Sequence, residues 1–117
     1  MRVFVYFNLH KKCWSVKALE GPDKGRVIAH EDTVNLIRPK FKVSQAGRNR
    51  VLKERTKNVH AGVEGIWTRQ SLFKVHSRCV EVTYNPYKYS SFVMSSNKYP
   101  IYTANFAMLS HGKVFVQ

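Results

Sequence analysis

The stretch KFKVSQAGRNRVLKERTKNVHAGVEGIW, Lys40 to Trp67, contains most of the information about how this chain folds. At its start, Phe41 and Val43 alternate with Lys40 and Lys42. Successive side chains of a strand point to opposite faces of its sheet. We therefore predict a strand with both lysines on one face.

The middle of this stretch, Ser44 to Lys57, is predicted to be a helix. Ser44 can accept hydrogen bonds from first-turn amides, although Gly47 occupies the position where a capping box has Glu or Gln. A basic hairpin arm is the alternative. Val59 to Trp67 alternates again and is predicted to be a strand. In the helix, one stripe carries Arg50, Lys53, Glu54 and Lys57, while Val51, Leu52 and Arg55 turn toward or flank the sheet.

Positive charge is concentrated in the same region. Between Arg38 and Lys57 the chain has eight Lys or Arg residues against one acid, Glu54, and the whole chain carries a formal charge of +13. Such a density favours binding to a polyanion. We predict phosphate contacts, with DNA or RNA as the partner. The alternatives are a surface for an acidic protein and a face that is merely solvated. The predicted contacts are Lys40, Lys42, Arg48, Arg50, Lys53, Arg55 and Lys57.

A second segment, Tyr84 to Tyr102, interleaves tyrosines with lysines. Tyr87 and Tyr89 flank Lys88 and, being two residues apart, are expected to share a face. Tyrosine rings on a surface can stack on unpaired bases. The alternative is that they are half-buried sheet residues. We predict that Tyr87, Lys88 and Tyr89 extend the nucleic-acid surface.

The rest of the chain predicts one α+β domain, residues 1–117, of mostly antiparallel sheet with one short basic helix. The opening strand is apolar on both faces, so we predict that it lies inside the sheet. Because Pro39 follows the apolar run Val34–Ile37, we expect that run to lie toward an edge or an end of the sheet. The further strands predicted are Met1–Leu9, Cys13–Leu19, Arg26–His30, Val34–Ile37, Leu72–His76, Cys79–Tyr84, Pro100–Leu109 and Lys113–Val116.

The chain has no stretch of the roughly 18 apolar residues that a membrane span needs, and no export signal. We therefore expect a cytoplasmic protein with reduced Cys13 and Cys79. No cofactor is expected, because phosphate-cradling and dinucleotide glycine patterns are absent.

Two further hypotheses concern chemistry. His10, Cys13, His76 and Cys79 form two H-x-x-C pairs that could bind zinc together, but such cysteines are more often small buried side chains. His60, near Lys57 and Arg48, could act as the base of a metal-independent ribonuclease. The simpler interpretation is that His60 is an ordinary strand residue next to a binding surface. We therefore favour a protein that is not an enzyme.

Two sequence elements resemble a known group of proteins. GRxRV (Gly47, Arg48, Arg50, Val51) and KNVHA (Lys57 to Ala61), together with the opening FNLHKKCWSV, resemble small basic proteins of tailed bacteriophages. The resemblance covers about residues 1–65. It implies a phage protein that acts in the cytoplasm of the bacterial host, and it brings no catalytic residues with it. The alternative function is then a phage inhibitor that binds an acidic host protein.

Overall fold

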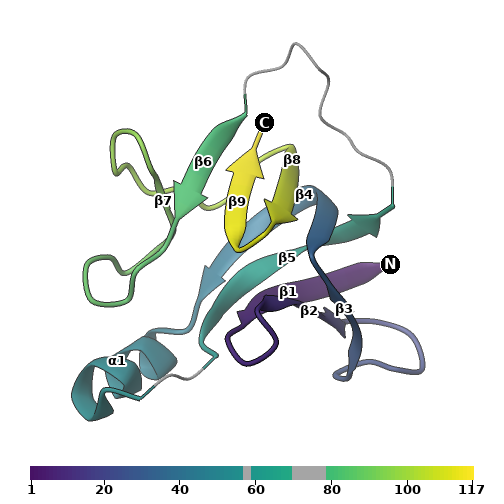
Figure 1. Cartoon of the computed structure of the whole chain (residues 1–117), viewed down its shortest axis with the longest axis horizontal. Helices are drawn as coiled ribbons and strands as arrows, with labels where there is room; N and C mark the ends of the chain where they lie inside the picture. Colours follow the sequence, from purple (N-terminus) through teal and green to yellow (C-terminus); the bar gives the residue numbers. More distant parts are fainter. Residues whose placement is uncertain (57–58, 70–78) are drawn as a thin grey trace.

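A computed structural model describes residues 1–56, 59–69 and 79–117, which form a nine-stranded antiparallel sheet and one helix (Figure 1). The strand order is β3-β2-β1-β5-β4-β8-β9-β6-β7. The prediction of mostly antiparallel sheet with one short helix is confirmed. The elements are β1 Arg2–Asn8, β2 Cys13–Ala18, β3 Val27–Glu31, β4 Thr33–Val43, α1 Gln45–Glu54, β5 Ala61–Thr68, β6 Val80–Thr83, β7 Val93–Met94, β8 Phe106–Ser110 and β9 Lys113–Val116.

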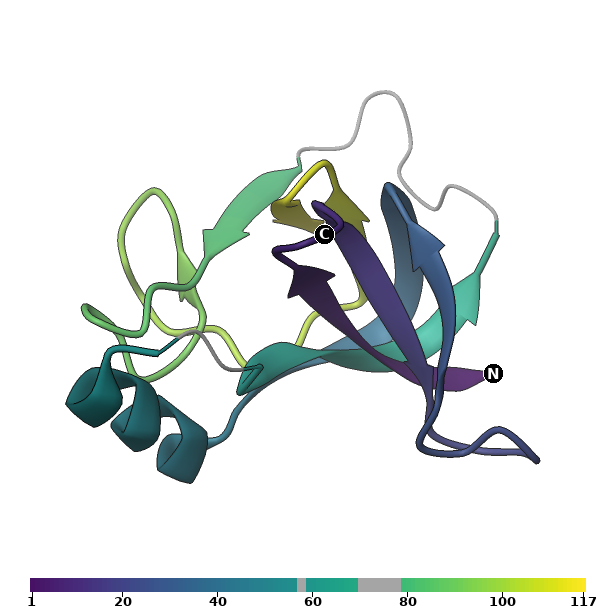
Figure 2. The ribbon, with the colours of Figure 1, turned by 60° about the horizontal axis from the view of Figure 1, so that its bottom comes forward.

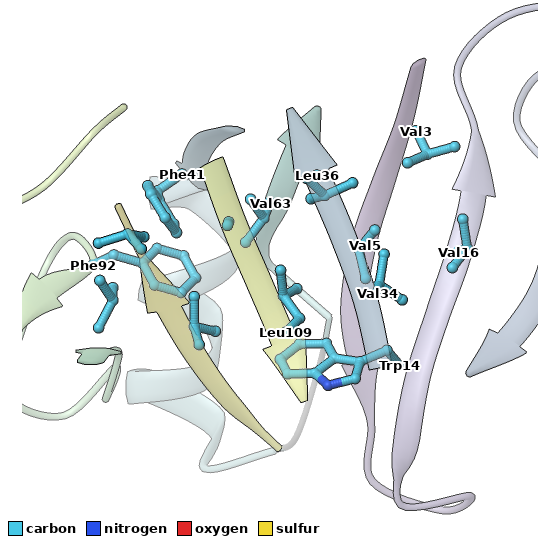
Figure 3. Close-up of a cluster of buried hydrophobic side chains, with 14 residues drawn as sticks. Val3, Val5, Trp14, Val16, Val34, Leu36, Phe41, Val63, Phe92 and Leu109 are labelled. Atoms are coloured by element: carbon cyan, nitrogen blue, oxygen red, sulfur yellow. The ribbon is translucent and has the colours of Figure 1, made fainter. Parts of the chain in front are cut away.

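The sheet curls so that one face forms the core. Buried side chains from β1, β2, β4, β5, β6, β8 and β9 belong to one cluster, and β2 contacts β4 without pairing with it. Figure 2 shows the β1–β2 hairpin crossing β4. In Figure 3, Val3 and Val5 lie on one side of the cluster and Phe41 and Phe92 on the other. A single twisted sheet can bury this much apolar surface only by curling on itself.

The first strand lies inside the sheet, as predicted. β1 pairs antiparallel with both β2 and β5, so its backbone groups have partners on both sides. Val3 and Val5 point into the core, whereas Phe4 and Tyr6 are half-buried on the outward face. Apolar residues on both faces of this strand therefore indicated its central position.

The expectation that Pro39 moves its segment toward an edge or an end of the sheet is wrong. β4 runs through Pro39 and pairs with β5 and β8. The register with β5 shifts between Ile37 and Lys40, and Arg38 has a positive φ of 52°. This bulge adds one residue and leaves Pro39 where no ladder hydrogen bond from its nitrogen is needed.

Local signals set the ends of α1. The Ser44 side chain accepts a hydrogen bond from the Gly47 amide at 3.2 Å, which confirms the predicted cap. The helix ends at Glu54, three residues before the predicted end at Lys57, because Arg55 adopts a left-handed conformation (φ 55°). The Arg55 amide then bonds to the Val51 carbonyl and closes the last turn.

The second half of the chain follows the prediction in part. β9 has the predicted bounds, and the β8–β9 turn falls at the predicted His111 and Gly112. β8 begins only at Phe106, because the preceding segment makes isolated bridges to β4 and β7. The predicted strand Leu72–His76 lies outside the described residues. In the described ranges, no helix has the length and apolar character needed to cross a membrane.

Candidate nucleic-acid interface

The outward face of β1, β5 and β4 brings cations together. Lys40 and Lys42 are both exposed and alternate with buried Phe41, so they share this face, as predicted. Lys40 lies opposite Glu64 of β5, whose carboxylate is 3.7 Å from Arg2 Nε. Arg2, Arg38 and Lys40 border a shallow hollow beside Glu64. Three cations thus surround one carboxylate here.

The cations of α1 divide into two groups. Arg50 and Lys53 are exposed on the helix, and Arg55 is exposed at its end, while Val51 is buried as predicted. Arg48 is half-buried instead, and its Nε donates hydrogen bonds to the carbonyls of Pro86 (3.0 Å) and Tyr89 (2.9 Å). Lys57 lies outside the described residues. We name the exposed cations Lys40, Lys42, Arg50, Lys53 and Arg55 the β4–α1 cations.

Arg48 joins the two segments that the sequence singled out. Its bonds to the Pro86 and Tyr89 carbonyls attach residues 86–89 to α1, and Gln45 Nε2 adds a bond to the Ser90 carbonyl at 2.8 Å. Tyr87 and Lys88 remain exposed beside the helix, and Tyr89 is half-buried. The structure therefore brings the predicted aromatic residues next to the basic helix.

An open groove of about 800 Å³ lies next to this junction. Its walls come from the end of β1 and the turn after it, the start of β5, β6 with the segment after it, and the β8–β9 turn. Residues 59–63 form one wall, and they include Val59, His60 and Ala61 of the KNVHA element. Most of the lining is apolar or aromatic, including Phe7, Trp14, His60, Tyr84, Tyr87 and Phe92.

His60 and Tyr84 form a polar pair in the wall of the groove. His60 Nε2 lies 2.7 Å from the Tyr84 hydroxyl, and the rings meet edge to face at 5.5 Å. Burial raises the pKa of Tyr84 above its ordinary value of 10.0, and the positive charge of Arg48 opposes this shift. The imidazole nitrogen proposed as a ribonuclease base therefore already has a partner, and Arg48 Nε points at loop carbonyls.

The zinc hypothesis finds no assembled site in the described ranges. There, no group of three His, Cys, Asp or Glu side chains could hold a metal ion. His10 lies within the β1–β2 turn and Cys13 is the first residue of β2, and both Cys13 and Cys79 are free thiols. His76 lies outside the described residues, so the complete set of four is not placed.

Few of the cations have internal partners. Between described residues, ion pairs form at Arg2 with Glu64 (3.7 Å) and at Arg69 with Glu31 (3.5 Å). None of the β4–α1 cations forms one within residues 1–56, 59–69 and 79–117. Their charge is thus not neutralised inside the described part of the fold, which leaves it available to an external anion.

Sequence reasoning missed the groove itself and the rings of Phe7 and Trp14 that line it. These residues alternate within apolar segments and look like ordinary core residues. Only the curl of the sheet brings β1, β2 and β6 around one hollow. A weak signal was present in Trp14 and Phe7, because aromatic residues face each other across the predicted first hairpin, and their rings lie 5.2 Å apart.

A family comparison and a comparison with individual proteins both identify the same phage protein family. Residues 1–117 match the family described as Mycobacterium phage L5 gene 82 protein. The "Gene 82 protein" of Mycobacterium phage L5 is 42% identical over 120 residues, which cover 97% of this chain and 94% of that protein. No solved structure is significantly similar to the chain. The resemblance to phage proteins is confirmed, and it extends beyond the expected 65 residues.

Proposed function

The chain belongs to the family of the Mycobacterium phage L5 gene 82 protein, and from this premise we propose that it binds nucleic acid in the infected host cell. The β4–α1 cations contact phosphates, and Tyr87 and Lys88 extend the surface. The proposed site of action is the bacterial cytoplasm. Binding by phosphate neutralisation positions a nucleic acid without reading its sequence.

One observation supports this proposal above the others. The β4–α1 cations are exposed and form no ion pair among the described residues, although Lys40 lies opposite Glu64. A domain with a formal charge of +13 repels itself when folded. A polyanion relieves that repulsion and releases its counterions on binding. Affinity for a polyphosphate is therefore the function that this arrangement favours.

The test compares two variants with the same loss of charge. Lys40, Lys42 and Arg50 are changed to Ala in one, and Lys24, Arg26 and Lys98, exposed elsewhere, in the other. Retention of labelled DNA and RNA is measured across a salt series. If the first three contact duplex phosphates, the slope of log K against log salt falls by about 2 to 3 in that variant. The control keeps nearly the wild-type slope.

Arg48 is left intact in this test because its substitution would release residues 86–89 from α1. Both variants should unfold at nearly the wild-type temperature, since exposed substitutions change stability by about 0.5 kcal/mol or less. Equal loss of binding in both variants would reject the β4–α1 cations as the contact surface. No retention of either nucleic acid by the wild-type protein would favour the other expectation, an acidic host protein.

A further inference from the structure

The open groove next to the junction of α1 and residues 86–89 is lined by many aromatic side chains. Phe7 of β1, Trp14 of β2, and Tyr84, Tyr87 and Phe92 of the segment between β6 and β7 line a hollow of about 800 Å³ that opens to solvent, and Trp14 and Phe92 among them are buried. This volume lies within the range of ligand sites, roughly 300 to 1,000 Å³. Tyr87 is 58% exposed, and Phe7 and Tyr84 are half-buried, so these are the rings that a flat ligand in the groove could contact with a whole face.

The same wall offers hydrogen bonding to such a ligand. The Tyr84 hydroxyl and His60 Nε2 form a 2.7 Å pair there. A nucleobase has both a flat π-face and an edge of donors and acceptors. It therefore suits the rings and the polar pair together.

Charge around the groove fits the phosphates attached to such a base. Lys113 lines the groove, the adjacent segment carries exposed Lys88, and half-buried Arg48 of α1 is hydrogen-bonded to that segment. Glu81 also lines it and is the single carboxylate among the lining residues that the structure describes. The cations make an acidic protein an alternative partner, but carboxylate side chains would leave the ring faces without a flat partner.

We infer that this groove takes an unpaired nucleobase, and that the protein therefore prefers single-stranded nucleic acid to duplex. The inference rests on the proposed function, because the β4–α1 cations supply the phosphate affinity. In a duplex the bases are stacked on one another, so their faces cannot reach the groove. Stacking on protein rings contributes about 1 to 3 kcal/mol per base, which corresponds to roughly fivefold or more in affinity.

The intrinsic fluorescence of Trp14, which lines the groove, is the signal for the experiment. Trp67, the second tryptophan, does not line the groove and stacks with Arg69 instead, so Trp67→Phe leaves Trp14 as the reporter. A single-stranded oligothymidylate should quench the Trp14 fluorescence of this variant, and a duplex of equal length should not. Retention of both nucleic acids is measured in parallel, which tests the proposed function separately.

A charge placed in the groove tests its location. Val59 is 62% exposed and lines the groove, so Val59→Glu introduces a carboxylate there without removing a buried side chain. It should raise the Kd for the single strand at least about fivefold. Val27→Glu on the edge strand β3, 42% exposed and away from the groove, is the charge-matched control and should have a much smaller effect. Thermal unfolding verifies that both variants fold.

The outcomes separate the two ideas. Equal retention of single strand and duplex, with unchanged Trp14 fluorescence, would overturn the groove inference and leave the proposed function standing. Absence of retention for every nucleic acid would overturn both. Quenching of Trp14 by polyglutamate as strong as that by oligothymidylate would show that the groove takes an acidic chain, which also contradicts the inference.

Discussion

The concave side of the sheet has a closed end and an open end. At the closed end, Val3, Val5, Val16, Val34, Leu36 and Leu109 are fully buried, and branched aliphatic side chains fill the space between strands (Figure 3). At the open end, half-buried Phe7 and Tyr84 and exposed Tyr87 line the groove, together with Trp14 and Phe92, which are themselves buried. The six aliphatic residues all lie in strands, whereas Tyr84 and Phe92 lie in the segment between β6 and β7.

This contrast indicates how the molecule divides its tasks. Aliphatic residues pack closely and give stability, because each buries its apolar surface completely. The open end contains a polar pair, His60 and Tyr84, that must keep its hydrogen bond when it is partly removed from water. The closed end should therefore dominate stability, while the open end is available for a ligand.

The largest effect is expected at the closed end. Leu36→Ala should lower the free energy of unfolding by about 2 to 5 kcal/mol, because Leu36 is fully buried and a cavity would remain. Denaturant unfolding measures this change. Ile66→Ala on the outward face, where the side chain is 40% exposed, is the control and should cost clearly less. Similar losses at both positions would contradict the assignment of stability to the closed end.

The closed end was largely predictable from sequence, because alternation within single strands indicates which residues face the core. Val3 and Val5 in β1 followed this rule, and Ser44 marked the start of α1 correctly. Pro39 did not follow the usual preference, because the left-handed conformation of Arg38 creates a bulge that accommodates it in a central strand. No local sequence pattern predicts such a bulge at an arginine.

The open end could be predicted only in part, because four separate segments form it. The basic residues of 38–57 and the tyrosines of 84–102 were visible as clusters in the sequence. Their adjacency depends on Arg48, which was expected to contact phosphate but hydrogen-bonds to the carbonyls of Pro86 and Tyr89. A long-range contact of one side chain with backbone carbonyls leaves no signal in composition or periodicity.

An intermediate effect is expected at the strand that joins the two ends. A Cβ at Gly62, which lines the groove, would lie 2.6 Å from the Val5 carbonyl oxygen and 2.4 Å from the Phe4 ring. Gly62→Ala should therefore destabilise by about 1 to 3 kcal/mol through overpacking. At Gly65 in the same strand the nearest atom is 3.1 Å away, so Gly65→Ala is a milder comparison. If Gly62→Ala unfolds at the wild-type midpoint, the Phe4 ring and the Val5 carbonyl move aside without cost, which would contradict close packing between β1 and β5 at this position.

The smallest effect is expected from the polar pair, and it depends on pH. Tyr84→Phe removes the hydrogen bond to His60 and should cost about 0.5 to 1.5 kcal/mol near neutral pH. Because burial raises the pKa of Tyr84, the folded protein holds this proton more tightly than the unfolded chain does. The stability that Tyr84 contributes is then fully present below the ordinary pKa of 10.0 and is lost as pH rises through the higher folded value.

Denaturant midpoints of wild type and variant, measured from pH 7 upward, should differ most below about pH 10 and converge above it. Lysines titrate in the same range in both proteins, so the difference between the two curves isolates Tyr84. A gap that widens with rising pH would mean that the phenolate is favoured in the groove, which would contradict burial as the dominant influence on this side chain.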